Sequence, residues 1–109
     1  MTVADLQKAL SLAAVSLPEG DREVEGVYIG DLLSWVMGRA QSGNAWLTIM
    51  SNLNVVAVAT LSDVSCILLC EGVTLEESVR STAEEKGINI LATPLTAYEA
   101  AKKLAELGL

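Results

Sequence analysis

The sequence contains no histidine, and this absence narrows the chemistry open to the chain. Histidine is the usual general base, the usual proton shuttle and the commonest metal ligand of proteins. Hydrolysis by a serine–histidine or cysteine–histidine pair is therefore excluded. There is also no phosphate-binding loop of the G-x-x-x-x-G-K-[ST] type, and Gly26 and Gly30 lack the third glycine of a dinucleotide-binding loop. The sequence thus predicts a protein that is not an enzyme and that holds no cofactor or metal.

Only two cysteines are present, Cys66 and Cys70, four residues apart in one apolar run. If the run is a strand, both point to the same face and lie about 13 Å apart, at ~3.3 Å per residue. That separation is too long for a disulfide, and two cysteines without histidine do not make a zinc site. We predict two buried thiols that act as small hydrophobic side chains.

Basic residues are scarce: seven Lys and Arg stand against fourteen Asp and Glu, so the formal net charge is −7. Such a chain repels phosphate backbones and anionic lipids. We therefore exclude nucleic acid and membrane surfaces as partners. The acidic connector 19–25 lacks the spacing of a calcium loop, and we interpret it as a solvated segment.

One stretch, residues 40–62, carries no charge and has to be considered as a membrane span. Its glutamine, glycine and asparagines are costly in hydrocarbon and common in turns and helix caps, so we reject a span. Near the amino terminus, Asp5 comes early and no basic region precedes an apolar one. We expect no signal peptide and a cytoplasmic location.

The composition favours a small aliphatic core. Hydrophobic residues make up 51% of the 109 residues, whereas aromatic residues make up only 4%. A chain of this length and hydropathy folds and buries a core, but it is too short for a catalytic and a regulatory domain together. We expect residues 1–109 to form a single domain.

Residues 45–109 repeat one pattern, in which an apolar run is followed by a polar turn and an amphipathic stretch. The runs are 45–50, 66–70 and 88–92, and Trp46, Ile67 and Ile88 are each 21 residues apart. This spacing is typical of strand followed by helix. We predict an α/β fold, with a small, largely parallel β-sheet of about four strands flanked by helices and with ligands at the carboxyl ends of the strands.

The sequence pattern of the amino-terminal half predicts two helices and a strand. Thr2 can cap a first helix whose apolar residues recur every three or four positions until Leu17 and Pro18 end it. A short strand then reaches Gly30, and Asp31 stands where a cap of a second helix, 32–41, belongs.

The sequence pattern of the carboxyl-terminal half predicts three helices. The third follows Asn54 and is rich in valine, but its capping asparagine and its place between two strands favour a helix over a strand. Thr74 and Glu77 predict a capping box for the fourth helix, with Glu76 paired to Arg80 and Gly87 at the helix end. A second capping box, from Thr96 and Glu99, predicts the fifth helix.

Small polar residues gather where the strands are expected to end and the helices to begin. Free backbone N–H groups at helix starts attract anions, and polar side chains add directional hydrogen bonds. A small anion or nucleotide is one interpretation of this edge, and plain helix capping is the other. The candidate ligand-binding residues are Gly30, Asp31, Ser51, Asn52, Asn54, Glu71, Gly72, Thr93 and Thr96. Trp35 and Trp46 are interpreted as core or dimer-interface residues, and Tyr98 is left open.

Two segments carry a resemblance to a known family. Residues 26–37 (G-V-Y-I-G-D-L-L-S-W-V-M) followed by 54–59 (N-V-V-A-V-A) resemble the DRTGG domain, especially the small stand-alone relatives of the amino-terminal domain of HPr kinase/phosphorylase. The likeness covers residues 20–107, and its most specific part is G-D-L-L-S at 30–34. The Asp-Arg motif that names the family aligns near 52–53, where this chain has Asn-Leu, and the histidine of many relatives is missing from this loop.

The resemblance implies an α/β regulatory or interaction module with no activity of its own, because the phosphate-loop catalytic domain of the kinase is missing. We therefore expect a non-catalytic regulatory module that forms a homodimer, covering the third helix and the tryptophans, and that binds a protein partner or a small anionic ligand. Two alternatives stay open. One is a nucleotide or phosphometabolite sensor that uses the polar edge, and the other is a component of a phosphoryl-transfer system that lacks its own catalytic domain.

Overall fold

The three apolar runs form neighbouring parallel strands in the computed structural model, which describes residues 1–109. The strands of the sheet are Ala13–Ser16 (β1), Gly26–Ile29 (β2), Asn44–Thr48 (β3), Cys66–Leu69 (β4) and Ile90–Ala92 (β5). Their order is β1-β5-β4-β3-β2, and only β1 is antiparallel to its neighbour. Trp46 pairs with Ile67, and Ile67 pairs with Ile90. The predicted fold class is confirmed, with five strands in place of about four.

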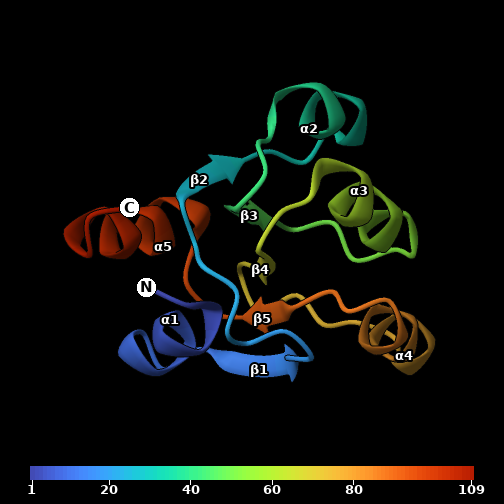
Figure 1. Cartoon of the computed structure of the whole chain (residues 1–109), viewed down its shortest axis with the longest axis horizontal. Helices are drawn as coiled ribbons and strands as arrows, with labels where there is room; N and C mark the ends of the chain where they lie inside the picture. The colour runs from blue at the N-terminus through green and yellow to red at the C-terminus, as the bar shows by residue number, and fades with distance from the viewer.

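Helices cover both faces of this sheet (Figure 1). They are Val3–Ala9 (α1), Leu33–Arg39 (α2), Asn54–Ser62 (α3), Glu77–Glu85 (α4) and Ala97–Glu106 (α5). Strands and helices alternate from β2 onwards, and α2, α3 and α4 lie on one face while α1 and α5 lie on the other. Trp46, Ile67 and Ile90 belong to the core on the first face, and Leu47 and Leu68 to the core on the second. No helix has the length and apolarity that a membrane span requires.

The segment 13–16 forms an edge strand, so the prediction that the first helix continues to Leu17 is wrong. The helix ends at Ala9, and Ser11 reverses the chain with a positive φ of 52°. The segment then pairs with β5, whose outer edge would otherwise have unpaired backbone groups. The buried Ser16 hydroxyl adds contacts to Glu84 Oε2 at 2.8 Å and to the backbone oxygen of Ile88 at 3.1 Å. Long-range strand pairing outweighs the local helical periodicity here.

Helix α3 forms in spite of its valine-rich sequence, as predicted. Val55, Val56, Val58 and Ala59 are buried against the sheet and its neighbouring helices. The helix propensity of valine costs only a few tenths of a kcal/mol per residue, about 0.7 kcal/mol at most, while burial of each side chain contributes roughly 1.5–3 kcal/mol. Tertiary burial therefore decides the conformation.

The two predicted capping boxes differ in outcome. Thr96 and Glu99 form the box that starts α5, with Glu99 N donating to Thr96 Oγ1 at 3.2 Å. At α4 the box is absent, because the chain is still extended at Glu76 and the helix begins at Glu77. The ion pair of Arg80 is accordingly with Glu77, at 2.7 Å, and not with Glu76. Gly87 follows the end of α4 with a φ of +72°, as predicted.

Both cysteines are free and buried in the same core, on the α1–α5 side of the sheet. Burial raises the pKa of Cys66 to about 12 and that of Cys70 to about 11. At neutral pH both therefore stay thiols, and the prediction that they act as small hydrophobic side chains is confirmed.

The buried amide of Asn89 joins three segments at the amino edge of the sheet. Its Nδ2 donates to the backbone oxygens of Glu19 at 2.8 Å and Ser65 at 2.9 Å, and its Oδ1 accepts from the backbone N–H of Glu19 at 2.9 Å. The residue is only 2% exposed. A side chain that satisfies three buried or half-buried backbone groups is hard to replace.

We therefore expect Asn89→Leu, which keeps the size of the side chain, to lower the free energy of unfolding by about 2–4 kcal/mol, because it leaves those backbone groups without partners. Urea denaturation monitored by circular dichroism measures the change. The control is Asn54→Leu, since the Asn54 side chain is exposed and we expect a change within about 0.5 kcal/mol. Equal effects of the two substitutions would contradict the role of Asn89.

Candidate functional site

The candidate residues all lie at the carboxyl edge of the parallel strands, but the structure separates them into groups. Gly30 and Asp31 follow β2, while Ser51, Asn52 and Asn54 follow β3. The loop after β4 contains Glu71 and Gly72, and the loop after β5 contains Thr93 and Thr96. The contacts of each group show which of them are free to meet a ligand.

Gly30 and Asp31 hold the loop after β2 against β3. Trp46 Nε1 donates to the backbone oxygen of Gly30 at 2.8 Å. Asp31 Oδ1 accepts from Thr48 Oγ1 at 2.8 Å and from the backbone N–H of Ile49 at 3.0 Å. The prediction that Asp31 caps α2 is wrong, because the cap position is Leu32 and its side chain makes no capping bond. The carboxylate instead satisfies polar groups where β3 ends.

The loops after β4 and β5 bind each other. Glu71 N donates to the backbone oxygen of Leu95 at 2.8 Å, and Gly72 N donates to that of Thr93 at 3.0 Å. Glu71 and Gly72 both have positive φ values, 60° and 73°. Thr93 Oγ1 accepts from Leu95 N at 3.2 Å, and Thr96 is engaged in its capping box. For these candidates the structure favours local capping over ligand binding.

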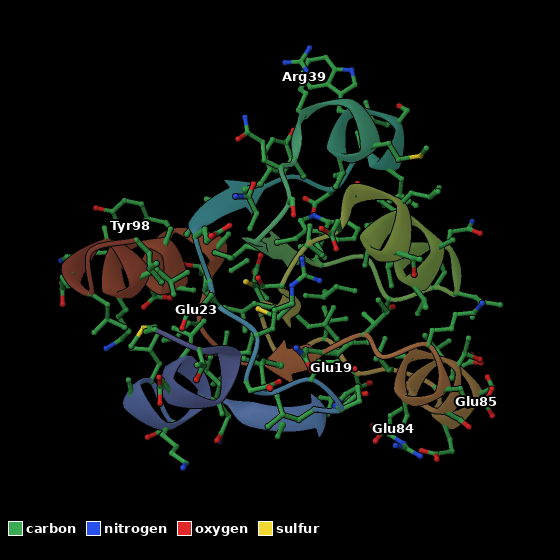
Figure 2. The ribbon with its side chains drawn as sticks, viewed as in Figure 1. Glu19, Glu23, Arg39, Glu84, Glu85 and Tyr98 are labelled. Atoms are coloured by element: carbon green, nitrogen blue, oxygen red, sulfur yellow. The ribbon has the colours of Figure 1, made fainter.

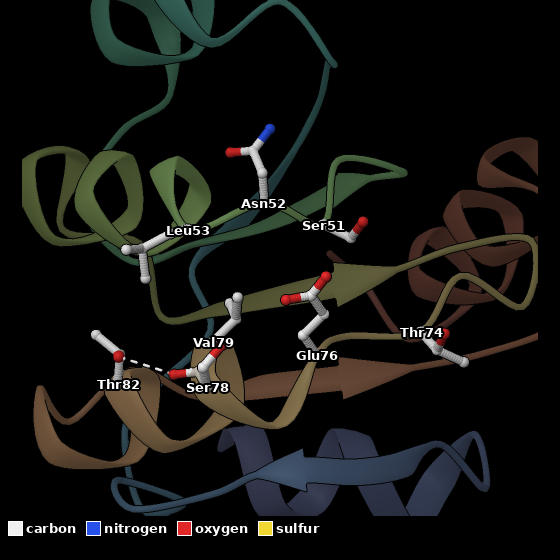
Figure 3. A pocket seen from close by; sticks show the side chains of 8 residues that line it. All are labelled: Ser51, Asn52, Leu53, Thr74, Glu76, Ser78, Val79 and Thr82. Atoms are coloured by element: carbon white, nitrogen blue, oxygen red, sulfur yellow. Dashed lines mark hydrogen bonds between the residues drawn. The ribbon is translucent and has the colours of Figure 1, made fainter.

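An open cleft lies between the loop after β3 and the start of α4 (Figure 3). We call it the 51–82 cleft; its volume is about 460 Å³ and it is lined by Ser51, Asn52, Leu53, Thr74, Glu76, Ser78, Val79 and Thr82. The Glu76 side chain rises from the α4 side towards Ser51 and Asn52 on the opposite wall (Figure 3). The structure therefore places the candidates Ser51 and Asn52 in a cavity large enough for a small molecule.

A second hollow adjoins the first along the helices. We call it the α3–α4 groove; its volume is about 450 Å³ and it is lined by Leu53, Asn54, Val56, Ala57, Thr60, Leu61, Thr82 and Lys86. Leu53 and Thr82 line both hollows, so the two are neighbours. Two of the eight residues that line the cleft are hydrophobic, compared with four of the eight that line the groove.

Most polar groups of the 51–82 cleft have no partner within the protein. The hydroxyls of Ser51, Thr74 and Ser78 and the carboxylate of Glu76 make no side-chain hydrogen bond, while Thr82 Oγ1 donates to the backbone oxygen of Ser78 at 2.9 Å (Figure 3). Glu76 is the one ionisable residue of the lining. No three His, Cys, Asp or Glu side chains are grouped so that they could hold a metal ion.

The α4 wall of the cleft was missed from the sequence. The sequence pattern predicts a cap for Thr74 and an ion pair for Glu76, and it predicts no role for Ser78 and Thr82. A usable signal was present, because Ser78 and Thr82 are one helical turn apart and give the inner face of α4 two hydroxyls. Which helix face meets the loop after β3 is, however, decided by the packing of α4 beside α3.

The aromatic side chains divide between core and surface. Trp46 is fully buried, as the core interpretation predicts, whereas Trp35 is 53% exposed. The Arg39 guanidinium lies 3.8 Å from the centre of the Trp35 ring, at the outer side of α2 (Figure 2). Tyr98 projects from α5 into solvent (Figure 2).

Comparison with known proteins identifies the type of domain. The model of the DRTGG domain matches residues 6–107 of this chain. A similar solved structure is the regulatory region of Clostridium perfringens pyrophosphatase, with CBS and DRTGG domains, complexed with its activator diadenosine tetraphosphate. The TM-score is 0.72 at 16% sequence identity, over 93% of this chain and 44% of that chain. Our chain thus spans less than half of that neighbour. A search among curated proteins gives no significant match.

The hydrogen bonds of Asp31 to Thr48 and Ile49 are predicted to stabilise the carboxyl edge of the sheet, and a substitution tests this role. We expect Asp31→Ala to lower the free energy of unfolding by about 1–2 kcal/mol, because the buried Thr48 hydroxyl loses its acceptor. Urea denaturation measures the loss. The control, Asp21→Ala, removes an exposed carboxylate from the connector and is expected to change stability by less than about 0.5 kcal/mol. Similar losses in both variants would show that the Asp31 contacts do not hold this edge.

Proposed function

Because this chain belongs to the DRTGG domain family, we propose that it is a non-catalytic regulatory module that binds a small ligand of the nucleotide class in the 51–82 cleft. The observation that carries the proposal is the cleft itself, an open cavity in which the side chains of Ser51, Thr74, Glu76 and Ser78 make no hydrogen bond within the chain, while Asn52 and Thr82 do. The absence of a base–nucleophile pair in the sequence supports a binding role rather than catalysis.

The pyrophosphatase regulatory region supports the ligand class. It is complexed with a nucleotide activator, so a region with a DRTGG domain takes part in regulation by a nucleotide. Our chain corresponds to 44% of that region. On this proposal the chain senses the ligand and a partner carries the response.

The position of the cleft explains how binding could be transmitted. One wall is the loop between β3 and α3, and the other is the first turns of α4. A ligand that contacts both walls fixes their separation and stabilises one arrangement of the two helices. Binding can shift such an equilibrium only by the difference in affinity for its states.

A thermal-shift screen tests the ligand proposal. With nucleosides, nucleotides and phosphorylated metabolites as the panel, we expect at least one compound to raise the melting temperature, since a ligand at 100 times its Kd stabilises the native state by about 2.7 kcal/mol. Ser78→Arg places a long side chain in the cleft and should abolish the shift.

The matched control for that screen is Ser34→Arg, an exposed serine-to-arginine change on α2 outside the cleft, which should keep the full shift. If no compound of the panel stabilises the protein, the ligand proposal is wrong. A shift that survives Ser78→Arg would place the ligand at another site.

Self-association is a second part of the proposal, and exposed apolar side chains near α2 support it. Ile29, Leu32, Trp35 and Met37 are each at least half exposed, and we call them the α2 surface. They adjoin β2, an outer strand of the sheet with an open edge. Covering such a surface by a second copy removes apolar area from water. By contrast, Trp46 and the valines of α3 are already buried within the chain, whereas Ala57 and Leu61 of α3 are exposed.

Light scattering coupled to size-exclusion chromatography tests self-association. We expect a mass of twice the chain mass of 11.5 kDa, and a monomer for Trp35→Asp, because a charge at a buried interface is costly. Tyr98→Asp is the matched control, since Tyr98 is exposed on α5 away from the α2 surface, and it should remain dimeric. A monomer at high concentration of the unmodified chain would contradict the proposal.

The relation to the amino-terminal domain of HPr kinase/phosphorylase stays a prediction based on the G-D-L-L-S element, as does a role in a phosphoryl-transfer system. The structure gives the Asp of that element a local role, the hydrogen bonds of Asp31 to Thr48 and Ile49. A protein partner and a cytoplasmic location likewise stay predictions.

A further inference from the structure

We infer that the ligand is held by an uncharged, polyhydroxylated group in the 51–82 cleft and by a flat apolar group in the α3–α4 groove. A nucleoside has this chemistry, with its ribose as the hydroxylated part and its base as the apolar part. The inference rests on the proposed function and deepens it, since it assigns the recognition to the nucleoside portion of a nucleotide and not to its phosphates.

The hydrogen-bonding groups of the cleft demand a ligand that both donates and accepts. The Glu76 carboxylate can only accept, whereas the free hydroxyls of Ser51, Thr74 and Ser78 can do either. The backbone N–H group of Ser78, in the first turn of α4, has no acceptor within the protein and can only donate. A sugar hydroxyl serves both kinds of partner, while a phosphate oxygen only accepts.

The charges around the cleft disfavour a phosphate in it. Glu76 has no cationic partner, and its carboxylate would face the phosphate across the cavity (Figure 3). The nearest cation on the same helix, Arg80, is held by Glu77 through contacts of 2.7–3.0 Å. A carboxylate and a phosphate that face each other in one cavity without a cation between them repel each other.

The groove supplies the surface for the apolar part of the ligand. Leu53, Val56, Ala57 and Leu61 line it, and Leu53 connects it to the cleft. The cleft and groove volumes of about 460 and 450 Å³ lie within the usual range of small-molecule sites, roughly 300–1,000 Å³ each. An aromatic base can lie between the side chains of α3 and α4.

The positions of Glu76, the α3–α4 groove and Lys86 along α4 predict that a nucleoside binds better than its nucleotide. Glu76 comes first, the apolar groove follows, and Lys86 stands at the far end, ten residues or about 15 Å further along the helix. A nucleotide has its ribose between base and phosphate. With the ribose at Glu76 and the base in the groove, the 5′-phosphate points away from Lys86 and gains no cation.

Isothermal titration with adenosine, uridine and their 5′-monophosphates tests the inference. We expect at least one nucleoside to bind at least about tenfold more tightly than its monophosphate. Glu76→Gln keeps the side-chain size but removes the charge, so it should reduce this preference to within about threefold. The matched control, Glu85→Gln, lies on the same helix outside the cleft and should leave the preference unchanged.

A second pair of variants tests the groove. Ala57 is exposed on α3 and lines the groove, so Ala57→Leu should fill it and weaken nucleoside binding about tenfold or more. Ala105→Leu makes the same change on the exposed side of α5 and should have no effect on binding. Circular dichroism confirms that each variant is folded.

The outcomes separate the inference from the proposed function. If a monophosphate binds more tightly than its nucleoside, the inference is wrong while the small-ligand function stands. If neither nucleosides nor monophosphates bind, the inference is also wrong, and the metabolite screen alone decides the proposed function. Nucleoside binding that Ala57→Leu leaves unchanged would contradict the assignment of the base to the groove.

Discussion

The fold depends on a sheet whose central strands are apolar on both faces. Such strands expose half of their side chains to water unless helices cover both sides. The chain meets this constraint by placing three crossover helices on one face and the first and last helices on the other. The parallel direction of β2 to β5 then follows, because every crossover returns the chain to the same edge of the sheet.

This constraint also determines where a site can lie. Parallel strands bring all their carboxyl ends together, and the loops there have backbone groups that need partners. Much of the edge is used to satisfy them: Asp31 binds the end of β3, and Thr93 and Thr96 cap their own segments. In the gap between the loop after β3 and α4, several polar side chains make no hydrogen bond within the chain, and this is the place where we propose that a ligand binds.

The proposed function rests both on the family of the chain and on the chemistry of the 51–82 cleft. The chain belongs to the DRTGG domain family, and a regulatory region with a DRTGG domain that resembles it in fold is complexed with a nucleotide. The acidic composition of this chain and the lone carboxylate of Glu76 restrict which part of a nucleotide such a cleft can hold. A weakly charged, hydroxyl-rich cleft suits a sensor, which has to release its ligand when the concentration falls.

The sequence by itself determined the features that depend on neighbouring residues. The repeated apolar runs predicted the parallel strands. Thr96 marked the start of a helix and Gly87 the end of one, because capping and turn chemistry act within a few residues. Only the tertiary structure decided that 13–16 forms a strand, that Asp31 binds β3, and that the wall of α4 faces the loop after β3. These features depend on hydrogen-bonding groups and surfaces that distant parts of the chain supply, and local sequence patterns carry no information about which distant group will be met.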